Sequence, residues 1–266
     1  MIIAGLHVET HGPEDAPPLL LSAGLGGSGA YWTLQVAALA EQYRVILYDH
    51  RGTGRSDRAL PDASIAAMGR DMATILDGLG IAGAAIVGHA AGGIAGLALA
   101  LDAPDRVDRL VVVNGWARAD RHLVRCFETR LALLRDSGIA AYVRAQPLFL
   151  YPAPWISRNF DRLEAEAEHV IGQFPATDTM ERRIAALASF DVVDRLAGCR
   201  VPVLALAAED DMLVPWTSSR ALAAGPPEAR LALLPRGAHA CNLTEPEAFA
   251  AALLPFLETS TAARAA

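Results

Sequence analysis

The seven residues VGHAAGG, positions 87–93, have the form of a sharp turn between a strand and a helix. AAIVGH (84–89) is an apolar run typical of a buried strand, and AAGGIAGLALALDAP (90–104) has a helical pattern. Gly88 and Gly92 flank Ala90 at two positions on either side, where the strained tip of such a turn needs neighbours with almost no side chain. In the G-x-S-x-G pattern the tip carries a nucleophilic serine, whereas Ala90 has only a methyl group.

Similar strand and helix patterns alternate on both sides of this turn. Near-continuous runs of Val, Ile and Leu predict strands that are buried on both faces, and the patterns between them predict helices that begin at Ser and end at Gly or Pro. Such alternation is typical of a mostly parallel sheet with helices on both faces. The other predicted strands are 17–24, 43–50, 108–115 and 201–209, and the other predicted helices are 28–42, 64–80 and 245–258.

The alternation stops between residues 117 and 195, where the pattern is helical and rich in Arg, Ala and Leu. We therefore interpret 117–195 as an inserted helical cap, and 1–116 together with 196–266 as the core of an α/β fold. The last eight residues, TSTAARAA, are expected to be frayed.

Composition narrows the class of protein. The 23 Lys and Arg residues against 30 Asp and Glu give a net charge of −7 without a basic block, so a nucleic-acid partner is not expected. No apolar run is long enough for a membrane span, and the N-terminus lacks the pattern of a signal peptide, so we expect a cytoplasmic protein. The three cysteines are far apart and form no C-x-x-C pair, so neither a disulfide framework nor a metal site is predicted, and no cofactor is implied.

An acid and a histidine follow the turn in chain order. AEDDMLVP (208–215) comes after the strand predicted over 201–209 and carries Asp210 and Asp211, and PRGAHACN (235–242) carries His239 in a loop of small residues. Histidine is the residue type best suited to exchange a proton near neutral pH, provided that an acid fixes its tautomer. The order of turn, acid and histidine is that of the α/β-hydrolases.

The sequence as a whole resembles an α/β-hydrolase with a helical cap, and several strings are similar to those of the RutD group. These strings are GLGGSGAYW (24–32), YDHRGTGRS (48–56), VNGW (113–116), AQPLFLYPA (145–153) and RGAHACN (236–242). The resemblance implies a hydrolase of the Rut pathway of pyrimidine degradation, which acts on linear C–N bonds in small acids such as carbamate or aminoacrylate.

The resemblance also implies roles for individual residues. His239 would be the general base and Asp211, four residues before Pro215, would orient it, with Asp210 as the alternative. The backbone N–H groups of Leu25 and Ala91 would form the oxyanion hole, which needs no side chain at position 90. Three residues that follow strand ends are candidates for substrate binding, since ligands of open α/β sheets bind at that edge: Trp32, Asn114 and Trp116.

Several functions remain open at this point. The first is weak hydrolysis by a water molecule that His239 activates at the vacant position of Ala90. The alternatives are a non-catalytic ligand-binding protein, a serine hydrolase whose nucleophile has been replaced by alanine, and cofactor-free oxygenation by the His–Asp pair. The expected partner is a small molecule, and the sequence leaves a homodimer open.

Overall fold

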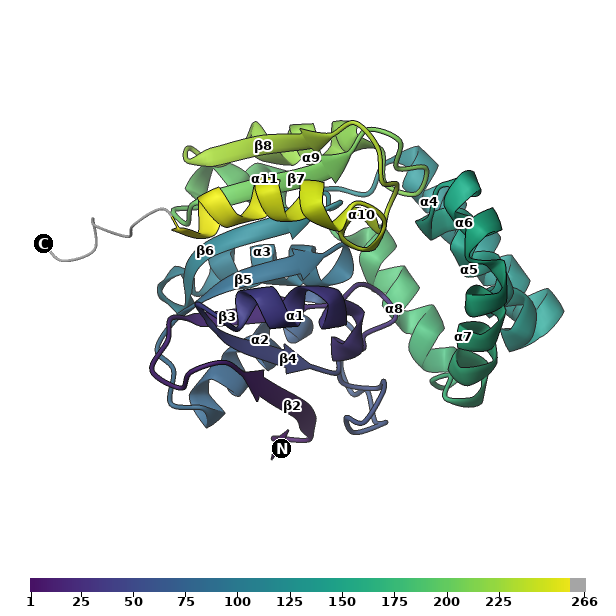
Figure 1. The fold of residues 1–266 in the computed structure, drawn as a ribbon, viewed down its shortest axis with the longest axis horizontal. Coiled ribbons are helices and arrows are strands. Elements are labelled where there is room, and N and C mark those ends of the chain that lie inside the picture. The colour runs from purple at the N-terminus through teal and green to yellow at the C-terminus, as the bar shows by residue number, and fades with distance from the viewer. Residues whose placement is uncertain (259–266) are drawn as a thin grey trace, which may run out of the picture.

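The computed structural model describes residues 1–258, and the expectation for the tail 259–266 lies outside this range. An eight-stranded sheet in the order β1-β2-β4-β3-β5-β6-β7-β8 forms the centre (Figure 1). β2 pairs antiparallel with β1 and β4, and all later neighbours are parallel, which confirms the mostly parallel sheet. The strands are β1 (Ile2–Ile3), β2 (Leu6–His11), β3 (Pro18–Ser22), β4 (Arg44–Tyr48), β5 (Ala84–His89), β6 (Val107–Val113), β7 (Val203–Ala208) and β8 (Ala229–Leu234).

Helices cover both faces of the sheet. Side chains of α1 (Thr33–Leu39) and α11 (Pro246–Glu258) pack with one set of strand residues, and those of α2 (Ile65–Gly78), α3 (Ala91–Asp102) and α9 (Trp216–Ala223) pack with the other. Alternate residues of a strand point to opposite faces, so Leu20 and Leu21 belong to different clusters. The remaining short turns are the 3-10 segments Gly29–Trp32, Pro104–Arg106 and Val193–Gly198, and α10 (Cys241–Thr244).

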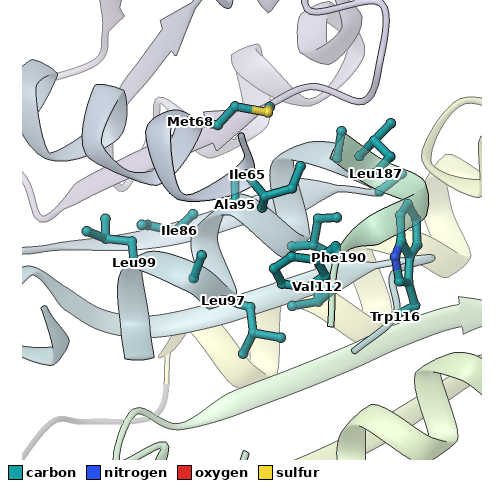
Figure 2. Close-up of a cluster of buried hydrophobic side chains, with 14 of the residues drawn as sticks. Ile65, Met68, Ile86, Ala95, Leu97, Leu99, Val112, Trp116, Leu187 and Phe190 are labelled. Carbon is teal, nitrogen blue, oxygen red and sulfur yellow. The ribbon is translucent and has the colours of Figure 1, made fainter. Parts of the chain in front are cut away.

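The chain between β6 and β7 forms a separate group of helices, here called the inserted helices. They lie beyond the carboxyl ends of the parallel strands (Figure 1), which is the edge where α/β sheets bind ligands. Leu187 and Phe190 anchor this group, since they share one buried cluster with Ile86 and Val112 of the sheet (Figure 2). The inserted helices are α4 (Arg121–Ala132), its π-helical continuation Leu133–Ser137, α5 (Gly138–Leu150), α6 (Ala153–Arg158), α7 (Phe160–Gly172) and α8 (Thr177–Ser189).

Two N-terminal strands were not expected from the sequence. β1 and β2 are joined by Ala4 and Gly5, both with positive φ, and extend the sheet in the antiparallel sense. β2 follows no strand–helix alternation and only its residues Leu6 and Val8 are fully buried, so its apolar signal is weak. No helix in the described part of the chain has the length and hydropathy needed to span a membrane.

Candidate active site

The turn between β5 and α3 is strained at its tip. Ala90 has φ 44° and ψ −106°, a conformation that residues with a side chain rarely adopt. The adjacent chain leaves no room for side chains at the flanking positions, since a Cβ on Gly88 would lie 2.3 Å from the backbone nitrogen of Gly93 and one on Gly92 would lie 2.4 Å from Ser22 Oγ. The chain therefore keeps the turn geometry of a nucleophile elbow although its tip residue cannot attack a substrate.

A histidine and a carboxylate form a buried pair after β7 and β8. His239 Nδ1 donates to Asp211 Oδ2 over 2.7 Å, and both side chains are almost fully buried. The other oxygen of Asp211 accepts the backbone N–H groups of Leu213 (2.8 Å) and Val214 (3.0 Å), so the carboxylate is held in place from both sides. A proton on Nδ1 leaves Nε2 of a neutral His239 as a proton acceptor.

Asp210, the alternative partner of the histidine, has a different role. Its Oδ1 accepts the backbone N–H of Ala238 over 2.7 Å, so it fixes the loop before His239 and does not contact the imidazole. The two adjacent carboxylates are therefore separated in function by their geometry: Asp211 faces the ring and Asp210 faces the backbone.

The loop that carries His239 is attached directly to the elbow. His89 Nε2 donates to the carbonyl oxygen of His239 over 2.8 Å, and the centroids of the two rings lie 4.5 Å apart. Burial lowers the pKa of His89 well below its usual value, and the charge of His239 acts in the same direction. His89 is therefore neutral, with its proton on Nε2, and it positions the loop instead of acting as a nucleophile.

Asn114 connects three parts of the site. Its Nδ2 donates to the carbonyl oxygens of His239 (2.7 Å) and Ala238 (3.3 Å), and its Oδ1 accepts the backbone N–H of Ala208 at the end of β7 (3.1 Å). The residue is fully buried and has φ 48°, a left-handed conformation that Asn tolerates better than most residues. These contacts make Asn114 a positioning residue, with its amide already occupied by backbone groups.

The two backbone groups expected to form an oxyanion hole lie in segments next to the elbow. Ala91 begins α3, so its N–H is among the first helical amides, which have no acceptor within the helix. Leu25 follows β3, and the loop that carries it approaches His89 so closely that a Cβ on Gly24 would lie 2.7 Å from His89 Nδ1. This close approach requires glycine at position 24 and brings the loop to the elbow.

The two candidate tryptophans occupy different environments. Trp32 is fully buried in the cluster on the α11 side of the sheet, and its ring centroid lies 6.3 Å from that of Phe249. Trp116 belongs to the same buried cluster as Ala90, and its indole N–H has no acceptor within residues 1–258. The indole N–H of Trp32 also has no acceptor within residues 1–258, and its ring contacts that of Tyr31 at a centroid distance of 5.2 Å, so these contacts do not separate the two tryptophans as substrate-binding candidates.

Tyr31 is a residue of the site that the sequence analysis did not single out. Its ring stacks on His89 with a centroid distance of 4.8 Å, and its hydroxyl donates to Asn242 Oδ1 over 2.6 Å. Burial raises the pKa of Tyr31 well above its usual value, so the hydroxyl stays protonated and remains a donor. Its position next to Trp32 in GLGGSGAYW was the available signal, but the pattern does not show which aromatic ring faces the elbow.

The inserted helices contact both loops of the histidine–aspartate pair. The carbonyl oxygen of Leu150, at the end of α5, accepts the backbone N–H of Ala240 over 3.0 Å. His122, in the first turn of α4, donates from Nε2 to the carbonyl oxygen of Met212 over 2.6 Å. The ends of α4 and α5 therefore border the site on the side away from the sheet.

A surface hollow of about 490 Å³ lies elsewhere on the molecule. Its position before β7 and β8 places it at the amino ends of the strands, opposite the edge that carries His239, so we assign it no part in the chemistry. It is lined by Ala197, Gly198, Cys199, Arg200, Pro227 and Glu228.

Comparison with known proteins places the chain among the α/β-hydrolases. A family profile described as the alpha/beta hydrolase fold matches residues 17–138. The chain is 57% identical over 263 residues to a protein of Caulobacter sp. (strain K31), and 52% identical over 253 residues to one of Azorhizobium caulinodans, both carrying the name "Putative carbamate hydrolase RutD". The first alignment covers 98% of each chain and the second covers 95% of each.

Solved structures agree with the fold. The enol-lactonase from Burkholderia xenovorans LB400 superposes with a TM-score of 0.86 and 28% sequence identity, covering 96% of this chain and 98% of that one. A hydrolase from Pseudomonas aeruginosa PA01 superposes with a TM-score of 0.80 and 29% identity, covering 95% and 94%. The architecture and the relatives identify an α/β-hydrolase fold and a hydrolase.

Proposed function

Because the chain belongs to the RutD family of α/β-hydrolases, we propose that it hydrolyses a small nitrogen-containing acid, carbamate or aminoacrylate, in pyrimidine catabolism. The relatives' printed name supports the carbamate class of substrate. The single observation that carries the mechanism is a complete His239–Asp211 pair beside an elbow whose tip is Ala90. With no nucleophilic side chain at the tip, the attacking group is water.

The reaction proceeds in two steps with His239 as proton carrier. His239 Nε2 takes a proton from water as the water oxygen bonds to the carbon that carries nitrogen, and Asp211 stabilises the resulting imidazolium. The electron pair displaced from that carbon moves to an oxygen or nitrogen of the substrate. For carbamate, His239 returns the proton to the leaving nitrogen, and the C–N bond breaks to give bicarbonate and ammonia. For aminoacrylate, which reacts through its imine tautomer, the returned proton gives a carbinolamine. His239 then carries the hydroxyl proton of this carbinolamine to the nitrogen as the C–N bond breaks, which gives a keto acid and ammonia.

The N–H groups of Leu25 and Ala91 would stabilise the negative charge that develops in the first step. One such donor contributes roughly 100- to 1000-fold in rate, and it does so without a side chain at the tip. A serine protease deprived of its triad keeps about 1000-fold acceleration over water. An acceleration of that size is useful only for a substrate that decays readily, and both carbamate and aminoacrylate are labile C–N compounds.

The inserted helices complete the proposed site. We interpret 117–195 as a cap over the carboxyl edge of the sheet, with Trp116 beneath it and Tyr31 beside His89 as lining groups. If such a lining excludes water, it strengthens the hydrogen bonds from Leu25 and Ala91 to a developing charge.

The experiment that tests this proposal follows the decay of carbamate and of aminoacrylate by mass spectrometry, with and without protein. We expect decay that accelerates in proportion to protein concentration. His239→Ala should remove at least about 100-fold of the catalysed rate because the general base is lost, and Asp211→Asn should also lower it because the imidazole loses its fixed tautomer.

The matched control removes a histidine from the surface. His169 is exposed in the last turn of α7, so His169→Ala should keep the wild-type rate. Decay rates that coincide with and without protein at every concentration would reject the hydrolase mechanism. If His239→Ala then changed only ligand affinity, the protein would be a non-catalytic binder. An Ala90→Ser variant that gave a burst of esterase activity would instead favour a serine hydrolase whose nucleophile has been replaced.

A further inference from the structure

Arg130 on α4 is a buried cation inside the inserted helices. Its side chain lies between α4 and α5 and the residue is 4% exposed. One guanidinium nitrogen, Nη2, donates to Tyr142 Oη and to Gln146 Oε1, each over 2.8 Å. The guanidinium carbon lies 5.3 Å from the ring centroid of Tyr142 and 5.7 Å from that of Phe149, so two aromatic faces and two neutral dipoles fix its orientation.

No carboxylate forms an ion pair with this cation within residues 1–258. Its hydrogen-bond acceptors there are neutral, no carboxylate pairs with it, and Nε has no acceptor. Burying a charge without a counter-charge is strongly unfavourable, and buried arginines are therefore normally paired. Arg144, on α5, differs from Arg130 because it is exposed and pairs with Glu164 and Glu168 on α7.

Arg130 can be placed relative to the His239–Asp211 pair along α4 and along α5. Burial raises the pKa of the thiol of Cys126, one turn earlier on α4, while the charge of Arg130 lowers it and the charges of Asp120 and Asp211 raise it. On α5, Gln146, which accepts a hydrogen bond from Arg130, lies one turn before Leu150. The carbonyl oxygen of Leu150 accepts the backbone N–H of Ala240. Four residues of α-helix rise about 6 Å and eight rise about 12 Å. Gln146 and Arg130 therefore lie one and two turns, respectively, from the residues of α5 and α4 that contact the loops of the pair, Leu150 and His122.

We propose that Arg130 binds the carboxylate of the substrate and makes the site selective for small acid anions. The inference rests on the proposed hydrolysis of a small acid and adds the group that recognises the acid. A guanidinium held by Tyr142 and Gln146 is oriented before the ligand arrives, so little side-chain freedom is lost on binding. The anion supplies the missing counter-charge, whereas a neutral amide or ester of the same shape leaves the cation unpaired.

The test measures binding of non-hydrolysable ligands, independently of turnover. Propionate serves as the small acid and propionamide as its neutral isostere, titrated by calorimetry or ligand-detected NMR at constant ionic strength. We expect wild-type protein to bind propionate at least about tenfold more tightly than propionamide, which corresponds to loss of one charge-assisted hydrogen-bonded contact. Arg130→Met should abolish this preference, and Arg130→Lys should retain part of it.

The matched control removes a positive charge from the same helix. Arg125 is exposed and pairs with Glu128 one turn away, so Arg125→Met should leave both affinities unchanged. If Arg130→Met does not fold, Arg130→Lys decides the question by a loss of propionate affinity with unchanged propionamide affinity. Equal binding of the two ligands to wild-type protein, or equal propionate affinity in wild type and the Arg130 variants, would overturn the proposal.

The results also separate this proposal from the proposed reaction. The protein could bind propionate selectively through Arg130 and yet not accelerate the decay of carbamate or aminoacrylate. That result would support the anion site and reject the proposed hydrolysis. The protein could instead accelerate the decay while its preference for propionate over propionamide is the same with and without Arg130. That result would support the hydrolysis and reject the anion site.

Discussion

At the scale of single residues, the site depends on backbone conformations that few amino acids accept. Ala90 and Asn114 both have positive φ and lie at the ends of β5 and β6, next to the loop that carries His239. Strained residues persist only where the surrounding structure holds them, and they are frequent at functional sites. The surrounding structure here consists of close backbone approaches that exclude a Cβ at Gly88 and Gly92.

Gly88 offers a direct test of this packing. A methyl group at position 88 would lie 2.3 Å from a backbone nitrogen and 2.4 Å from a backbone carbon, neither of which can move without displacing α3. We expect Gly88→Ala to lower the free energy of unfolding by about 3 kcal/mol, measured by urea denaturation. Gly172→Ala is the control, since a Cβ there meets nothing within 4 Å. A Gly88→Ala protein as stable as Gly172→Ala would contradict the tight elbow.

At the scale of elements, the carboxyl ends of neighbouring strands hold the loops of the site together. Asn114 after β6 binds the end of β7 and the loop after β8, and His89 at the end of β5 binds the same loop. The histidine and its acid therefore come from different loops but share one set of strand ends. The ends of α4 and α5 add contacts from the opposite side.

Asn114 is the residue by which this coupling can be measured. Asn114→Ala leaves the carbonyl oxygens of His239 and Ala238 and the N–H of Ala208 with fewer partners in a buried place. We expect a loss of about 2–3 kcal/mol in unfolding free energy, together with a fall in the catalysed decay rate because the histidine loop is less well held. Urea denaturation and the mass-spectrometric assay report the two effects. A variant that loses stability but keeps the full rate would show that the amide has no part in positioning His239.

At the scale of the whole molecule, buried neutral histidines link stability to pH. Burial lowers the pKa of His50 to about 3, and Arg183 acts in the same direction, while Ser22 Oγ lies 3.2 Å from its Nε2. His89 has its pKa lowered for the same main reason. Because the unfolded chain takes up these protons near pH 6.5 and the folded chain does not, the histidines favour unfolding increasingly as the pH falls below 6.5.

This reasoning predicts an acid-sensitive fold whose sensitivity depends partly on position 50. The unfolding free energy should be flat above pH 7 and should decline between pH 6.5 and 5. His50→Gln removes one titrating group and should make that decline shallower, even if it lowers stability at pH 7. Urea denaturation at pH 7 and pH 5 measures the difference. Identical slopes in the two proteins would mean that His50 takes up its proton equally in the folded and unfolded states, so that folding does not lower its pKa.

The sequence by itself determined the architecture, because its signals are local. Buried parallel strands appear as continuous apolar runs, helices begin at Ser64 and end at Gly or Pro, and the order of turn, acid and histidine marks the family. The exceptions include the β1–β2 pair and β8, whose short and mostly half-buried strands carry little pattern of their own. The oxyanion-hole roles of Leu25 and Ala91 and the cap boundaries at 117 and 195 are predictions from the sequence.

Only the tertiary structure decided which side chains meet. Asp210 and Asp211 are neighbours with the same chemistry, and the choice between them depends on the direction of each carboxylate after β7. Tyr31 and Trp32 are also neighbours in sequence, and only the structure shows that the ring of Tyr31 stacks on His89 while that of Trp32 packs near Phe249. The lack of a counter-charge at Arg130 is likewise visible only when α4 and α5 are packed together. Contacts between residues far apart in the chain depend on strand register and helix packing, and no local pattern records them.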